Sequence, residues 1–215
     1  MRTLTLREFH AEWREGMTAI FTVVDEMAPR EGVFHPPFRA ADWVHAGIPF
    51  DVWKAGSLVL DHVPELTERE VIARDAWPAW LGTLVEHDVK DFVLAVPPVW
   101  KNGLKEHDVM AAVVAPDWRD LSEGCRAIDA YIPEEWLAYG SGLNWGLYCH
   151  HEDFSILGAS PDWLSAFCAR FGDMRRLRRG FEDHIDFVLG GDDDPTTPME
   201  RYAASIKRSV KWPGT

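Results

Sequence analysis

The chain has 215 residues, 47% of them hydrophobic, and a formal net charge of -13 from 22 basic and 35 acidic side chains. This composition predicts one globular domain, residues 1–215, with a sizeable core. The charge disfavours nucleic acid and anionic membranes as partners, because both repel an acidic surface. The sequence contains no apolar run of about 18 residues and no apolar signal segment at its start, so we expect a cytoplasmic protein without a membrane span.

Two rare residue types add to this description. The 11 tryptophans are expected mainly in the core, with one or two left to anchor a partner. The three cysteines, Cys125, Cys149 and Cys168, form no close pair. An odd number without CxxC spacing predicts reduced, buried thiols rather than a disulfide framework.

The N-terminal segment predicts a helix followed by a long loop. Thr5 and Glu8 form a capping box, and apolar residues recur at helical spacing to about Met27. Residues 28–50 are rich in proline, glycine and aromatic residues, which predicts a loop packed on the domain or on a neighbour. Residues 52–60 have the length and composition of a short strand.

The middle of the chain predicts helices and an antiparallel strand pair. One helix is expected to start within residues 64–70, and a second is expected from Pro78, which suits a first helical turn. Residues 91–96 and 108–115 are apolar runs of strand length joined by a hairpin-like connection. Residues 117–132 have helical periodicity.

The C-terminal part predicts strands at residues 144–149 and 154–157, then a helix from Ser160 to Gly172 and a second helix at 174–189. An acidic loop, residues 190–198, precedes a short C-terminal helix. Helices and strands do not alternate regularly along the chain. We therefore predict an α+β fold, with a mostly antiparallel sheet of about four to six strands packed with several helices in a single domain.

The stretch from His150 to Asp153 is the strongest candidate for chemistry, and the pattern favours a hairpin tip. Residues before and after it alternate with period two, and polar residues are expected at an exposed turn. Adjacent histidines in a strand point to opposite sides, so they are poorly placed to bind one metal ion together. The sequence has Ser155 where HExxH needs its second histidine, and it contains no nucleotide-binding motif. We therefore predict no catalytic residue, no metal and no cofactor.

Charges are grouped along the chain. Arg178 and Arg179 precede Glu182 and Asp183 by four residues, so helical ion pairs are expected to neutralise this basic run, which also contains Arg175 and Arg176. Residues 181–200 hold seven acids and no lysine or arginine, and residues 61–91 hold eight acids against three bases. Such surfaces match a cationic protein partner.

Residues 144–172, "NWGLYCHHEDFSILGASPDWLSAFCARFG", resemble small bacterial immunity proteins of polymorphic toxin systems. In that family a "WG" strand leads through a histidine-glutamate turn to "LG" and an amphipathic helix. The chain has Gly158-Ala159 where those proteins usually have two glycines. The resemblance covers about 30 of the 215 residues and implies an inhibitor that binds a cognate toxin.

The sequence therefore predicts a non-enzymatic acidic protein that binds a basic partner, most concretely a toxin; its oligomeric state is left open. The residues expected to contact the partner are Asp192, Asp193, Asp194, His150, His151, Glu152 and Asp153. One alternative is a metal-dependent hydrolase in which His35 or His45 joins the His150–Asp153 cluster. Another is a structural subunit whose 28–50 loop docks on a neighbour.

Overall fold

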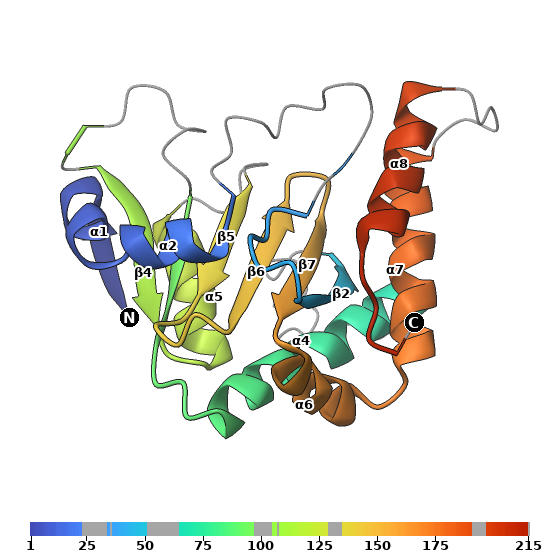
Figure 1. The fold of residues 1–215 in the computed structure, drawn as a ribbon, viewed down its shortest axis with the longest axis horizontal. Coiled ribbons are helices and arrows are strands. Elements are labelled where there is room, and N and C mark those ends of the chain that lie inside the picture. The colour runs from blue at the N-terminus through green and yellow to red at the C-terminus, as the bar shows by residue number, and fades with distance from the viewer. Residues whose placement is uncertain are drawn as a thin grey trace.

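The computed structural model of the protein describes residues 1–22, 34, 36–50, 65–96, 105–106, 108–128, 135–190 and 197–214. Within them seven strands form one sheet: β1 (Arg2–Thr5), β2 (Val44–Pro49), β3 (Phe92–Ala95), β4 (Val109–Val114), β5 (Trp136–Tyr139), β6 (Trp145–His150) and β7 (Phe154–Ala159). The helices are α1 (Leu6–Glu12), α2 (Arg14–Ile20), α4 (Glu68–Glu86), α5 (Trp118–Ala127), α6 (Pro161–Phe171), α7 (Met174–Leu189) and α8 (Pro198–Ser209) (Figure 1).

The α+β class is confirmed. The strand order is β1-β4-β3-β5-β6-β7-β2, and every pair is antiparallel. The sheet has more strands than predicted, partly because β2 lies inside the segment predicted as a loop. Edge strands tolerate proline, since the missing N–H faces away from the ladder, and β2 is an edge strand that ends at Pro49. The predicted strand at 52–60 lies outside the described residues.

The predicted single helix at the N-terminus is wrong. The capping box of Thr5 and Glu8 is present and starts α1, but β1 precedes it and Trp13 separates α1 from α2. The chain then turns extended at Phe21, where Thr22 N–H donates to Pro37 O and Arg39 N–H donates to Ile20 O. These long-range hydrogen bonds replace the next helical turn, and local periodicity does not reveal them.

The two helices predicted between residues 64 and 87 are one continuous helix, α4, with Pro78 inside it. Proline removes one backbone hydrogen bond of the helix and is normally unfavourable there. Burial offsets this cost, because Trp77 and Trp80 are fully buried and Trp80 packs edge-on against Phe92 and Trp145. Core packing therefore overrides the local helix-start signal.

Both faces of the central strands are covered, so the alternation along β6 separates two packed faces rather than core from solvent. On one face Trp145 lies between Trp80 of α4 and Trp163 of α6, with ring centroids 5.8 and 5.9 Å away. On the other face Tyr148 packs against Phe34 at 6.2 Å. In Figure 1 α4 and α5 lie behind the sheet, α2 lies in front of it, and α6 lies below the strands beside α4.

The described part of the predicted 28–50 loop packs on its own domain. Phe34, Trp43 and Phe50 are buried, and Phe38 covers Gly158, where a Cβ would come within 2.7 Å of its ring. This confirms the packing expected for the aromatic residues. It leaves the described side chains of this segment little apolar surface for a neighbour.

Tryptophan burial is also confirmed. Of the tryptophans that the structure describes, Trp13 and Trp118 are partly buried and the rest are buried; Trp53 and Trp100 lie outside the described residues. The three cysteines are free: Cys125 and Cys149 are buried, and Cys168 is partly buried. No described helix combines the length and apolar character needed to cross a membrane.

Gly47 in β2 lets α7 pack against the sheet edge. A Cβ at this position would lie 2.5 Å from Cγ of the buried Phe181 ring. We expect Gly47→Ala to lower the free energy of unfolding by about 1–3 kcal/mol, because overpacking forces the ring or the helix to move. Urea unfolding measures this.

The matched control is Gly142→Ala, whose nearest contact would be Asn144 Oδ1 at 3.3 Å. We expect it to change stability by less than about 0.5 kcal/mol. Equal stabilities of the two variants would contradict the packing of α7 against β2.

Candidate functional site

The predicted hairpin around "CHHEDF" is confirmed. β6 and β7 pair from Trp145 opposite Ala159 to His150 opposite Phe154. His151–Asp153 form the connecting turn, closed by Asp153 N–H donating to His150 O at 3.1 Å. Asp153 has φ 62°, a left-handed conformation that aspartate tolerates better than most residues.

His150 does not belong to an exposed tip, and this part of the prediction is wrong. Its side chain is buried, with only 3% of the residue exposed. The imidazole stacks on Phe154 with 4.4 Å between ring centroids and on His151 with 4.1 Å. The two histidines therefore do not point to opposite sides, because strand geometry ends at His150 and the turn brings the His151 ring alongside.

Glu135 completes the cluster, and sequence reasoning missed it. Its Oε1 lies 2.9 Å from His151 Nδ1 and 3.6 Å from His150 Nε2. Glu135 directly precedes β5, and the register places Trp136 opposite Cys149, so Glu135 falls level with His150. The proximity of Glu135 to His150 follows only from the pairing of β5 with β6, and the sequence did not predict β5.

The atoms of Glu135, His150 and His151 lie within 4.8 Å of one another, a separation that suits a metal ion. Proton placement argues against that use. Glu152 N–H donates to His150 Nδ1 at 3.0 Å, so Nδ1 holds a lone pair and the neutral ring carries its proton on Nε2. That proton faces Tyr202 Oη at 3.0 Å.

A histidine that binds metal through Nε2 must present a lone pair there, and its Nδ1–H then donates to a carbonyl or carboxylate. His150 has the reverse arrangement, because its Nδ1 meets a backbone donor. The three residues therefore do not fit a metal site as they stand. They form a hydrogen-bonded network that ties the hairpin turn to β5 and to α8.

The environment pushes the two histidines toward different charge states. Burial holds the pKa of His150 well below its ordinary value, and the neighbouring His151 lowers it further. The hydrogen bond to Glu135 raises the pKa of His151, an effect that burial opposes and the charges of Glu135 and Glu152 reinforce. Burial therefore favours the neutral form of the inner imidazole, and the Glu135 carboxylate favours the protonated form of the outer one.

A second buried histidine, on α7, hydrogen-bonds to the backbone of the turn. His184 of α7 is fully buried, and its Nε2 bonds to Asp153 O at 2.8 Å. The ring of Phe50 lies 4.3 Å from its ring. Hydrogen bonds to Glu135, just before β5, and to His184 of α7 therefore hold the turn, and Tyr202 of α8 bonds to His150 next to it.

The histidines expected to help a hydrolase do not join this cluster. His45 of β2 pairs with Gly158 of β7, and Gly158 pairs with Gly146 of β6. Gly146 lies four residues before His150 along β6. Four residues of strand correspond to roughly 13 Å. His45 instead accepts a hydrogen bond from Lys211 N–H at 3.3 Å. His35 lies outside the described residues.

The predicted acidic contact residues Asp192, Asp193 and Asp194 also lie outside the described residues. The other acidic stretch, 61–91, is partly neutralised within the molecule. Across α4, Glu68 and Asp75 pair with Arg176 of α7 at 2.7 and 3.4 Å, and Glu86 pairs with Arg170 of α6 at 2.8 Å. Those carboxylates hold helices together and offer less charge to a partner than their number suggests.

Comparison with known proteins gives no relative: no family model, no curated protein and no solved structure matches this chain.

The buried His45 makes stability depend on pH. Burial and then the Lys211 charge lower its pKa from 6.5 to about 4. Below pH 6.5 the unfolded chain therefore binds a proton that the folded chain binds only near pH 4. The free energy of unfolding decreases as pH falls below about 6.5. Between pH 7 and 5 this histidine should remove about 2 kcal/mol from the free energy of unfolding.

Urea unfolding of His45→Asn at both pH values tests this, because the asparagine oxygen can replace Nδ1 as an acceptor but does not titrate. We expect this variant to lose about 2 kcal/mol less than the wild type over that interval. The control, His87→Asn, changes an exposed histidine and should keep the wild-type slope. Parallel curves for all three proteins would refute this assignment.

Proposed function

We propose that this chain is a non-enzymatic, acidic protein-binding protein, and in its most concrete form an immunity protein that neutralises a bacterial toxin by direct contact. The contact would combine the hairpin turn, through His151, Glu152 and Asp153, with the acidic loop that contains Asp192–Asp194. The partner would be basic.

The observation that carries the proposal is the internal use of the His150 ring. Its Nδ1 accepts Glu152 N–H, and its Nε2 faces Tyr202. A histidine bonded in this way lacks a nitrogen for ligating a metal. What the turn offers outward is a fixed shape with partly exposed polar side chains, His151 at 45% and Glu152 at 38%. A pre-ordered turn loses little entropy on binding.

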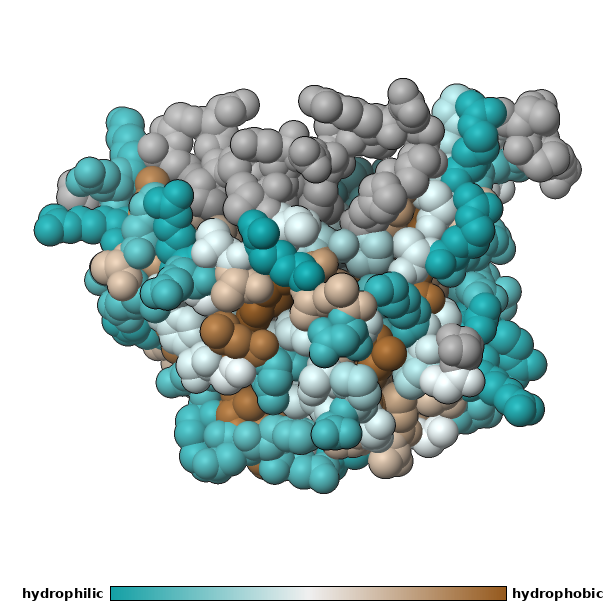
Figure 2. All heavy atoms as spheres, viewed as in Figure 1, coloured by the Kyte–Doolittle hydropathy of each residue, from teal (hydrophilic) through white to brown (hydrophobic). Residues whose placement is uncertain are grey.

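Surface character supports an electrostatic contact. In Figure 2 hydrophilic side chains cover α7 and α8, and apolar residues on this face form separate patches. The exposed large hydrophobic residues of the described chain come from different elements: Met1, Val85, Val109, Leu143, Phe187 and Met199. With a net charge of -13, charge complementarity is the stronger route to a specific encounter.

The hydrolase alternative would need the Glu135–His150–His151 cluster to exchange its internal hydrogen bonds for a metal ion. Native mass spectrometry of the protein purified gently from its own host separates the two functions. Binding predicts a basic protein at about one-to-one stoichiometry whose toxicity is relieved by co-expression of this chain. A whole-number metal occupancy without a protein partner would favour the hydrolase.

Removal of charge from the acidic loop should slow association with that partner. We expect the triple variant Asp192→Asn, Asp193→Asn, Asp194→Asn to reduce the association rate constant by about tenfold and to flatten its dependence on salt, because steering falls with charge. Stopped-flow mixing or surface plasmon resonance at several salt concentrations measures both.

The control variant Asp42→Asn, Asp88→Asn, Asp91→Asn removes the same charge from exposed positions elsewhere. It should change the rate far less. If both triple variants slow association equally, only net charge matters, and the 192–194 loop is not the docking surface.

A further inference from the structure

An open groove of about 530 Å³ lies along the N-terminal half of α7, lined by Asp173, Arg175, Arg178, Arg179 and Glu182. Its volume is within the range of small-molecule sites. The protein has a net charge of -13, so three positively charged guanidinium groups beside one groove are opposite in sign to its overall charge.

Helical geometry divides the four arginines of this run into two roles. Arg176 faces α4, where it pairs with Glu68 and Asp75. Arg175, Arg178 and Arg179 are spaced three and four residues apart, so they share a different helix face. All three are exposed.

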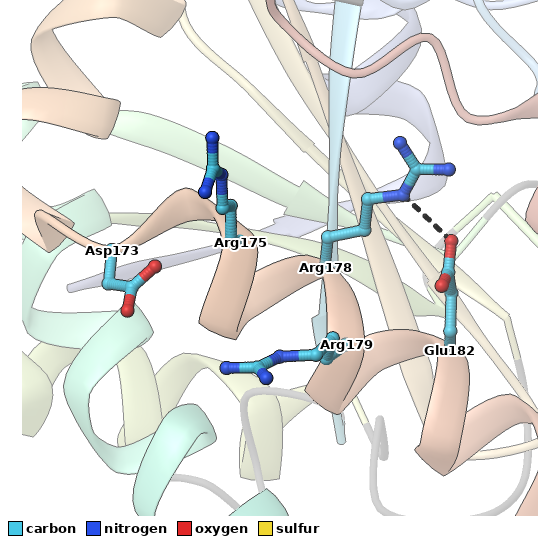
Figure 3. Close-up of a pocket in the computed structure, with 5 residues that line it drawn as sticks. All are labelled: Asp173, Arg175, Arg178, Arg179 and Glu182. Carbon is cyan, nitrogen blue, oxygen red and sulfur yellow. Dashed lines mark hydrogen bonds and ion pairs between the residues drawn. The ribbon is translucent and has the colours of Figure 1, made fainter.

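Only one of the two ion pairs predicted to neutralise the arginines of this face is present. Arg178 Nε donates to Glu182 Oε1 at 2.8 Å, as predicted. The predicted pair of Arg179 with Asp183 is wrong, because among the described residues neither Arg175 nor Arg179 has a carboxylate within 4.0 Å. Figure 3 shows Arg178 turned toward Glu182, whereas Arg175 and Arg179 do not turn toward either carboxylate of the groove.

The helix that carries these side chains is firmly placed. Leu177 and Gly180 on its inner side are buried, and a Cβ on Gly180 would meet Ile72 Cδ1 of α4 at 2.2 Å. Asp173 caps the helix by accepting from Arg176 N–H at 2.9 Å. The backbone positions of Arg175 and Arg179 are therefore fixed, with about 6 Å between their Cβ atoms.

We propose that this groove binds a phosphate monoester of a small hydroxylated molecule, such as a sugar phosphate, through Arg175 and Arg179. Two guanidinium groups with no carboxylate of the described residues within 4.0 Å match the charge of a phosphate monoester, about -1.5 to -2 at pH 7. They extend in different directions in Figure 3, and rotation of these exposed side chains would bring their forked donors to the phosphate oxygens. Carboxylate oxygens of Asp173 and Glu182 would accept hydrogen bonds from hydroxyl groups. A long polyanion fits less well, because the net charge of -13 on the protein repels it.

Isothermal titration calorimetry of the full chain with ribose 5-phosphate, inorganic phosphate and ribose tests this site, which does not depend on the proposed function. We expect ribose 5-phosphate to bind at one site, inorganic phosphate to bind more weakly and ribose not to bind. Arg175→Gln with Arg179→Gln should weaken ribose 5-phosphate by at least about tenfold, the equivalent of one good charged contact.

The matched control is Arg7→Gln with Arg14→Gln, which removes two exposed arginines from α1 and α2 and should leave the affinity unchanged. Thermal unfolding of both double variants confirms that they are folded. The proposal is overturned if ribose 5-phosphate does not bind or if the two double variants lose affinity equally. It is also overturned if phosphate or ribose alone binds as tightly.

Discussion

A single buried imidazole connects the parts of this molecule that the candidate site depends on. His150 ends β6, stacks on Phe154 of β7, accepts Glu152 N–H from the turn and faces Tyr202 of α8. Burying a polar ring is costly unless its nitrogens are hydrogen-bonded. The hairpin turn, the C-terminal helix and the strand pair must therefore keep their relative positions for this ring to stay satisfied.

The same constraint determines what the cluster can do. Glu135 and His151 lie close enough to His150 to suggest a metal centre, yet the backbone donor at Nδ1 assigns the proton to the nitrogen that a metal would need. Distance alone would have given the opposite conclusion. Internal contacts also decide which arginines of α7 a ligand can reach. Arg176 joins α4 to α7 through ion pairs, and Arg175 and Arg179 remain available at the surface.

Much of the fold could be predicted because its signals are local. The capping box at Thr5, the boundaries of α7 and the hairpin at residues 145–159 follow from patterns within a few residues. The errors arose where tertiary contacts override local preference: Pro78 sits inside a helix because Trp77 and Trp80 are buried beside it.

The candidate site shows the same limit. The turn residues could be found from polarity and alternation, but the burial of His150 and the role of Glu135 depend on β5, a four-residue strand whose pairing is not local. Helical spacing likewise predicted the pair of Arg178 with Glu182, but spacing alone could not tell that Arg176 would turn to α4.

The protonation state of His150 decides most directly whether the cluster is a hydrogen-bonded network or a metal site. A long-range ¹H–¹⁵N correlation spectrum of the folded protein near pH 7, assigned with His150→Asn, distinguishes the two neutral tautomers. We expect a neutral ring with the proton on Nε2, unchanged on addition of one equivalent of Zn²⁺. A proton on Nδ1, or a Zn²⁺-induced shift of the Nε2 signal to a metal-bound value, would contradict it and make the cluster a metal site.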